Sequence, residues 1–127
     1  MGEKVEFTLG KGEHGSTFGG NPVCCAGALN ILSRLDEALL AGVRERSEYI
    51  KSRLVGAKGV TGVSGMGLML GVSCERPAAD VVRECMARGV LVLTAKTRVR
   101  LLPALNIPMD VLEKAMDVLC EVIGDNQ

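Results

Sequence analysis

Apolar residues recur every three or four positions in the first part of the chain, a spacing that predicts helices with one apolar side. Asn21 and Pro22 open the pattern in the order that favours a helix start, with Asn as the N-cap and Pro in the first turn. The first stripe predicts a helix from Pro22 to about Leu39. We expect Gly42 to interrupt it, and a second stripe over residues 43–55 predicts another helix.

Beyond residue 56 the helical spacing gives way to short apolar runs, which are typical of strands. The first two runs are separated by Ser64-Gly65-Met66-Gly67, a turn sequence of the hairpin type, and the last two by the short polar link at residues 95–97. Strands joined by such short connections are antiparallel. The four strands are expected at residues 60–63, 68–72, 90–93 and 99–102.

Two further helices complete the pattern. Pro77 opens one, and Gly89 ends it as a residue suited to the left-handed conformation. The other is expected over residues 110–123. The order of elements predicts an α+β fold, in which a small, largely antiparallel four-stranded sheet is covered on one face by helices. We expect residues 1–20 to form an extended N-terminal segment and residues 21–127 to form the domain.

The length and charge of the chain narrow its possible partners. It has 127 residues, of which 47% are apolar, enough for a single domain with its own core. Fifteen basic and fifteen acidic residues cancel and no basic run occurs, which argues against a nucleic-acid partner. No uninterrupted apolar run reaches roughly 18 residues, so a membrane role is not expected.

The five cysteines predict a reducing environment rather than a disulfide framework. Their number is odd and no C-x-x-C pair occurs, so we expect free thiols in the cytoplasm. The only histidine is His14, and no ligand spacing for a metal ion is present. His14 could act as a general base, but no partner for it can be identified in the sequence, and a surface histidine in a loop is the simpler interpretation.

The glycine-rich segment from His14 to Pro22 suggests an anion-binding loop. Glycines surround Ser16 and Thr17, and the loop leads directly into a predicted helix. Exposed backbone amides, two hydroxyl groups and a helix N-terminus can together bind a phosphate.

Arg100 is the second candidate. It lies near the end of a predicted strand, just before the break at Pro103, and strand alternation places Arg98 and Arg100 on the same face. A guanidinium in that position can hold a carboxylate through two parallel hydrogen bonds. The alternative is a surface arginine on an edge strand.

Two distant motifs resemble those of class III (ornithine-type) pyridoxal-phosphate aminotransferases. They are G-S-T-F-G-G-N-P at residues 15–22 and V-R-L-L-P-A-L-N-I at residues 99–107. Between them, residues 65–71 look like the family's G-x-G-L-M-x-G hairpin, and residues 91–95 resemble a strand common in acetylornithine aminotransferases. The likeness spans residues 12–123 and corresponds to the C-terminal small domain of that family.

The resemblance implies roles for three residues. Ser16 and Thr17 match the loop that reaches the phosphate of pyridoxal 5'-phosphate, a cofactor bound mainly by the other subunit of a homodimer. Arg100 matches the arginine that holds the substrate carboxylate. In this family a lysine of the large domain binds the cofactor as a Schiff base. None of the six lysines here lies in a segment like that motif, so we expect no catalytic residue in this chain.

The chain is therefore expected to be the C-terminal piece of an aminotransferase and to be inactive alone. The resemblance implies transfer of the δ-amino group of N-acetylornithine to 2-oxoglutarate, a step of arginine biosynthesis. Succinylornithine, ornithine and 4-aminobutyrate are alternative substrates. A non-enzymatic regulatory module that binds an anion and a structural dimerisation domain are the alternatives from other classes. Two departures from the family pattern are Ala104, in place of a proline, and Lys96-Thr97-Arg98, where many relatives have Gly-Lys.

Overall fold

The computed structural model describes residues 8, 10 and 12–125 and divides into two compact units, residues 1–35 and residues 36–127. Each unit is described by itself. Within the predicted N-terminal segment, residues 1–7, 9 and 11 lie outside the described residues.

The first unit contains one helix, α1 (Pro22–Leu32). As the sequence predicts, Asn21 is its N-cap: the side-chain oxygen Oδ1 accepts hydrogen bonds from the amides of Val23 and Cys24 at 3.0 and 3.3 Å. Every residue of α1 is exposed, including apolar ones such as Leu29, at 67%.

The break between the first two helices is not where the sequence suggested. α1 ends at Leu32, and α2 (Glu37–Leu54) begins after Asp36, whose Oδ1 accepts a hydrogen bond from the amide of Leu39 at 2.8 Å. Gly42 lies inside α2. A helix interior tolerates a glycine at a cost of only about 1 kcal/mol, whereas Asp followed by Glu at a helix start stabilises a new first turn.

The second unit contains a four-stranded sheet in which all neighbouring strands are antiparallel, as predicted. The strand order is β1-β2-β4-β3. The strands are β1 (Val60–Met66), β2 (Met69–Cys74), β3 (Leu93–Ala95) and β4 (Arg98–Leu101).

Both hairpin turns differ in detail from the prediction. The first is tighter, because β1 continues through Gly65 and Met66 and only Gly67 and Leu68 connect the strands. Gly65 has a φ of +125°, and a Cβ there would lie 2.1 Å from the carbonyl oxygen of Met69, so only glycine fits. The second hairpin turns at Lys96, with a φ of 55°. It pairs residues next to that turn, which moves β3 to residues 93–95 from the predicted 90–93.

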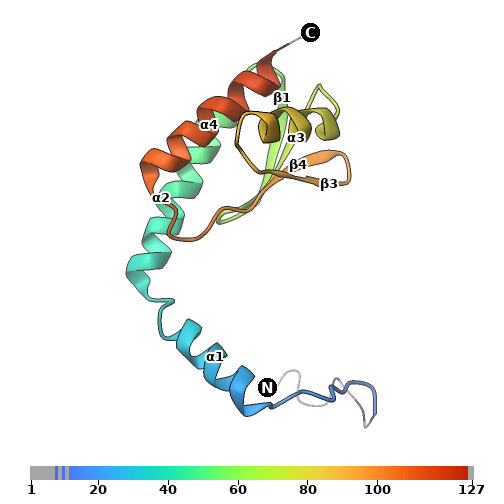
Figure 1. Ribbon diagram of the computed structural model, residues 1–127, viewed down its shortest axis with the longest axis vertical. Coiled ribbons are helices and arrows are strands. Elements are labelled where there is room, and N and C mark those ends of the chain that lie inside the picture. Colours follow the sequence, from blue (N-terminus) through green and yellow to red (C-terminus); the bar gives the residue numbers. More distant parts are fainter. Residues whose placement is uncertain (1–7, 9, 11, 126–127) are drawn as a thin grey trace. The chain divides into compact units, whose positions relative to one another are not determined.

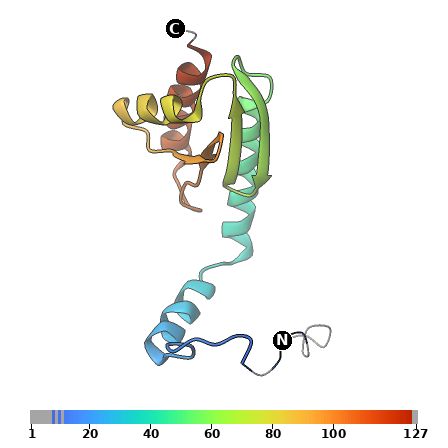
Figure 2. The ribbon, with the colours of Figure 1, turned by 90° about the vertical axis from the view of Figure 1, so that its right-hand side faces the viewer.

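Helices α2, α3 (Ala78–Ala87) and α4 (Met109–Gly124) cover one face of the sheet. Figures 1 and 2 show α2 and α4 side by side. No helix in the described part of the chain is both long enough and apolar enough to cross a membrane. The core joins all three helices to alternate strand residues, and its fully buried large side chains are Ile50, Leu54, Leu70, Leu119, Ile123, Val72, Val81, Val99, Val122 and Cys85.

The other face of the sheet carries none of the three helices of this unit, and we call it the open face. In β4, Val99 and Leu101 are buried, whereas Arg98 is exposed and Arg100 is half-buried. The predicted alternation is therefore confirmed, and both arginines point away from the helices. The second unit thus carries two guanidinium groups on the face of its sheet opposite its own helices.

Candidate functional site

The predicted phosphate loop forms two consecutive turns before α1. The amide of Gly19 donates to the carbonyl of Ser16 at 3.2 Å, and the amide of Asn21 donates to the carbonyl of Phe18 at 3.2 Å. Gly20 has a φ of +75°, which favours glycine. Ser16 is exposed, as is its neighbour Thr17. Within the described residues, neither hydroxyl group takes part in a hydrogen bond of the chain itself.

The helix N-terminus contributes less to this loop than the sequence suggested. The amides of Val23 and Cys24 in the first turn of α1 already donate to Asn21. The groups left to bind an anion are the two hydroxyls and the loop amides that face no acceptor. Hydroxyls and free amides are the donors that a phosphate requires, so the loop fits the phosphate of a cofactor such as pyridoxal phosphate.

Arg100 occupies the middle of the open sheet face. Its Cα lies opposite Gly71 of β2 on one side and Leu93 of β3 on the other. Its Nε atom is buried and has no hydrogen-bond partner among the described residues. A buried guanidinium nitrogen without an acceptor is costly, which makes Arg100 a candidate for holding an anionic ligand. Arg100 belongs to the second unit, whereas Ser16 and Thr17 belong to the first.

Arg98 lies on the same face and has a defined partner. Its Nη1 atom donates to the hydroxyl oxygen of Ser64 in β1 at 2.7 Å. The side chain passes close to Gly71, where an added Cβ would lie 3.4 Å from Cδ of Arg98 and 3.5 Å from Oγ of Ser64. The absence of a side chain at Gly71 gives Arg98 room to cross β2.

These residues line a shallow concavity of about 710 Å³ on the open face, which we call the sheet-face concavity. None of its described lining residues is acidic, and three are basic. Sequence reasoning singled out Arg100 but missed Ser64 and Gly71, because neighbours across strands depend on the strand order β1-β2-β4-β3. The lining consists of Ser64, Gly65, Met66, Met69, Leu70, Gly71, Ala95, Lys96, Thr97, Arg98 and Arg100.

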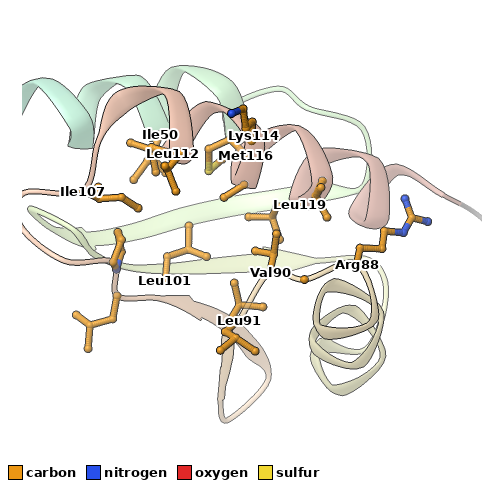
Figure 3. A pocket seen from close by; sticks show the side chains of 17 residues that line it. Ile50, Arg88, Val90, Leu91, Leu101, Ile107, Leu112, Lys114, Met116 and Leu119 are labelled. Atoms are coloured by element: carbon orange, nitrogen blue, oxygen red, sulfur yellow. The ribbon is translucent and has the colours of Figure 1, made fainter.

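A second cavity, of about 480 Å³, lies between α4 and the segments at residues 88–92 and 101–107. Figure 3 shows apolar side chains such as Leu112 and Leu119 along it, while the charged ends of Arg88 and Lys114 lie at its margins. It contains no nucleophile and no acid–base pair, so we assign it no chemistry.

Glu84 of α3 is the centre of a small group of ion pairs. Arg76 and Arg88 both bind Glu84, at 2.9 and 2.6 Å. Hydrogen bonding from Arg76, with a further contribution from Arg88, lowers the pKa of Glu84. His14 is exposed in its loop. In the described part of the chain, no group of three or more His, Cys, Asp or Glu residues could hold a metal ion.

The comparisons with known proteins agree with the resemblance carried by the motifs at residues 15–22 and 99–107. The family model for class-III aminotransferases matches residues 2–123. The chain belongs to this family. Members of the family depend on pyridoxal phosphate, and a structure of the ornithine aminotransferase from Toxoplasma gondii has this cofactor at partial occupancy in its active site.

Among curated relatives of this class-III chain, the acetylornithine aminotransferase of Haemophilus ducreyi is 42% identical over 98% of the chain and 32% of its own length. The mitochondrial acetylornithine aminotransferase of Saccharomyces cerevisiae is 36% identical over 97% of the chain and 31% of its own length. The chain therefore spans about a third of the length of the relatives it matches.

Solved structures show the same fold. The acetylornithine aminotransferase of Elizabethkingia anophelis superposes with a TM-score of 0.77 at 27% identity, over 91% of this chain and 31% of that one. The ornithine aminotransferase of Toxoplasma gondii also gives a TM-score of 0.77, at 29% identity, over 91% of this chain and 30% of that one. The α+β fold expected from the sequence is confirmed.

Proposed function

We propose that this class-III chain is the C-terminal domain of an acetylornithine-type aminotransferase, which moves the δ-amino group of N-acetylornithine to 2-oxoglutarate. The observation that carries the proposal is the position of Arg100, on the open sheet face with a buried nitrogen that has no acceptor among the residues that the structure describes. The identity of 42% to an acetylornithine aminotransferase supports this specificity. Such a reaction would place the protein in arginine biosynthesis, and its five free cysteines agree with a cytoplasmic location.

In this proposal the loop at residues 15–20 helps to hold the cofactor. When bound, pyridoxal phosphate supplies an electron sink for the chemistry at the amino-bearing carbon. Ser16 and Thr17 would donate hydrogen bonds to its phosphate, in a homodimer in which the other subunit holds most of the cofactor. We place this loop within an N-terminal segment of residues 1–20 and the remaining residues, 21–127, in the small domain.

Arg100 would bind the carboxylate of the substrate. Its planar fork can donate two parallel hydrogen bonds, which fix the orientation of the substrate as well as its position. The orientation of the substrate affects the reaction rate, because the reacting atoms must be held close together and correctly aligned. The lysine that carries the cofactor in this family has no counterpart among the six lysines of this chain. We therefore propose that the chain needs a large domain to act and is inactive alone.

A different ω-amino substrate is the main alternative. A Pyrococcus furiosus protein named as a putative LysW-aminoadipate semialdehyde/glutamate semialdehyde transaminase is also 42% identical, over 95% of this chain. Overall identity in this domain therefore does not separate the two specificities, and substrate assays are required.

A chimera provides the test. The chain replaces the matching third of the Haemophilus ducreyi acetylornithine aminotransferase, and transamination is assayed with acetylornithine, ornithine and succinylornithine. We expect activity from the chimera, highest with acetylornithine, and none from the 127-residue chain alone. Transamination by the isolated chain would contradict the proposal.

Variants of the chimera test the individual residues. Thr17→Ala should weaken cofactor retention, measured as loss of cofactor absorbance on dialysis, whereas Thr61→Ala, in β1, is the matched control. Arg100→Lys should raise the KM for both the amino donor and the oxo acid roughly tenfold or more, because lysine cannot make the bidentate contact of a guanidinium with the substrate carboxylate. An unchanged KM for both substrates would remove Arg100 from the site.

A further inference from the structure

Arg46 of α2 is bound to the segment that follows the strand carrying Arg100. Its Nε atom donates a hydrogen bond of 2.7 Å to the carbonyl of Ile107, in the segment of residues 102–108 that joins β4 to α4. Figure 1 shows this segment passing beside α2 before α4 begins. Arg46 is half-buried and makes no ion pair in the described part of the chain, so its defined partner there is this neutral carbonyl.

Gly42, one helical turn before Arg46, gives the guanidinium its space. Long side chains on a helix point back toward its N-terminus, and residues four positions apart share one face. A Cβ at residue 42 would lie 2.5 Å from Nη1 of Arg46, so any side chain there would displace the guanidinium. A glycine inside a helix lowers its stability relative to alanine. The space that Arg46 needs explains why a glycine occupies this position.

The segment held by Arg46 follows a short strand with little of its own to keep its end closed. β4 has four residues, and its last pair with β2 is at Leu101, one residue after Arg100. Strand ends with few contacts open locally at low cost in free energy. Ile107 is held twice, because its side chain packs against the core and its carbonyl binds Arg46. A fixed Ile107 limits the freedom of the strand end, and with it the freedom of Arg100.

We propose that Arg46 is a positioning residue for Arg100, and that Gly42 serves it by leaving space for its side chain. The hydrogen bond to Ile107 keeps the end of β4 paired, so that the Arg100 guanidinium is held on the open face before the substrate arrives. A side chain ordered before binding loses less conformational entropy when the ligand binds. The inference rests on the function proposed for Arg100 and extends it to two residues of the helix that covers the opposite face of the sheet.

The kinetics of the chimera test the role of Arg46. Arg46→Met removes the donor and keeps an unbranched side chain. We expect the KM for both the amino donor and the oxo acid to rise about three- to fivefold, the range of one hydrogen bond, with kcat at saturation unchanged. A merely structural defect would reduce the amount of folded enzyme, and hence the apparent kcat, without changing KM. Arg44→Met, which removes an exposed arginine of the same helix that pairs with Glu37, is the matched control and should change neither.

Gly42→Ala disturbs the same contact from the other side. Alanine in place of a glycine inside a helix ordinarily favours the folded state about fivefold. We expect this gain in urea unfolding of the chain that also carries Arg46→Met, and little of it when Arg46 is present, because the new Cβ displaces the guanidinium. The two substitutions are then not additive. In the chimera, Gly42→Ala alone should raise the KM for both substrates.

Hydrogen exchange of the 127-residue chain gives a measurement that does not depend on activity. Arg46→Met should speed the exchange of the amides in the β2–β4 ladder and leave those of the β1–β2 ladder unchanged, because only the end of β4 is released. Equal acceleration in both ladders would mean a general loss of stability, and the local role of Arg46 would be wrong.

The outcomes separate this inference from the proposed function. If Arg46→Met leaves both KM values unchanged while Arg100→Lys raises them, the positioning role is wrong and the role of Arg100 stands. If Arg100→Lys changes neither value, the role of Arg100 fails and the inference fails with it. Additive effects of Gly42→Ala and Arg46→Met on unfolding would overturn the role given to Gly42.

Discussion

The hydroxyl of Ser47 in α2 donates a hydrogen bond of 2.7 Å to the carbonyl of Gly67 in the β1–β2 turn. Ser47 is 5% exposed and is the one buried polar residue in the described part of the chain. The bond fixes the tight hairpin against the helix that covers the sheet. It therefore helps to set the position of the strands that carry the sheet-face concavity.

Ser47→Ala should destabilise the second unit by about 1 kcal/mol, because the partly buried carbonyl of Gly67 would lose its donor. Urea unfolding measured by the fluorescence of Tyr49, the single tyrosine, reports on this unit. The control is Ser52→Ala, which removes a hydroxyl whose bond to the carbonyl of Tyr49 is exposed. Equal midpoints for the two variants would contradict the prediction.

Gly65→Ala should be more damaging than Gly56→Ala. Both glycines have positive φ, +125° and +81°. A Cβ at Gly65 would lie 2.1 Å from the carbonyl oxygen of Met69, whereas a Cβ at Gly56 meets nothing within 4 Å. Gly56→Ala therefore carries only backbone strain, about 1–2 kcal/mol, and we expect Gly65→Ala to exceed it by at least about 2 kcal/mol in urea unfolding. If Gly65→Ala lost no more unfolding free energy than Gly56→Ala, the close contact between residue 65 and Met69 would not matter for stability, and the prediction would be contradicted.

The cysteines should divide into two reactivity classes. Cys24 and Cys25 are exposed on α1, whereas Cys85 is fully buried in the core. Burial raises the pKa of the thiols of Cys74, Cys85 and Cys120, which lowers their thiolate fraction at neutral pH. A thiol reagent at pH 8 should therefore label two cysteines rapidly, and mass spectrometry of the labelled peptides should identify Cys24 and Cys25. Rapid labelling of Cys85 in native buffer would contradict the packing of α3.

Glu84 should make the stability of the second unit depend on pH. Its hydrogen bond from Arg76, and then that from Arg88, lower its pKa in the folded state below the ordinary value of 4.5. The stabilisation is therefore present above about pH 4.5 and is lost as the pH falls through the lower, folded-state pKa. Glu84→Gln should flatten this acid limb of the stability profile, measured by urea unfolding between pH 3 and pH 7. Glu45→Gln, at an exposed position of α2 outside any ion pair of the described residues, should leave it unchanged.

The sequence predicted elements well wherever a local signal was strong. Asn21-Pro22 defined the start of α1, and the alternation around Arg100 assigned its face correctly. The predicted boundary between the first two helices is wrong, because the cap at Asp36, and not Gly42, separates them. The third strand lies at residues 93–95 rather than at the predicted 90–93. The apolar run around Val92 is buried in the core and resembles a strand, but the hairpin pairs the residues next to Lys96.

Residue identities and short spacings are enough to predict the α+β order of elements, the family motifs and the two candidate binding groups, a hydroxyl pair and an arginine. These features can be predicted because residue types and spacings of a few positions decide which side of a helix or strand each side chain occupies. The folded domain was needed to reveal that β2 and β4 are neighbours, and hence that Ser64, Gly71, Arg98 and Arg100 share one surface. Pairing between strands far apart in the chain depends on how the whole core packs, and that information is not contained in any short stretch of sequence.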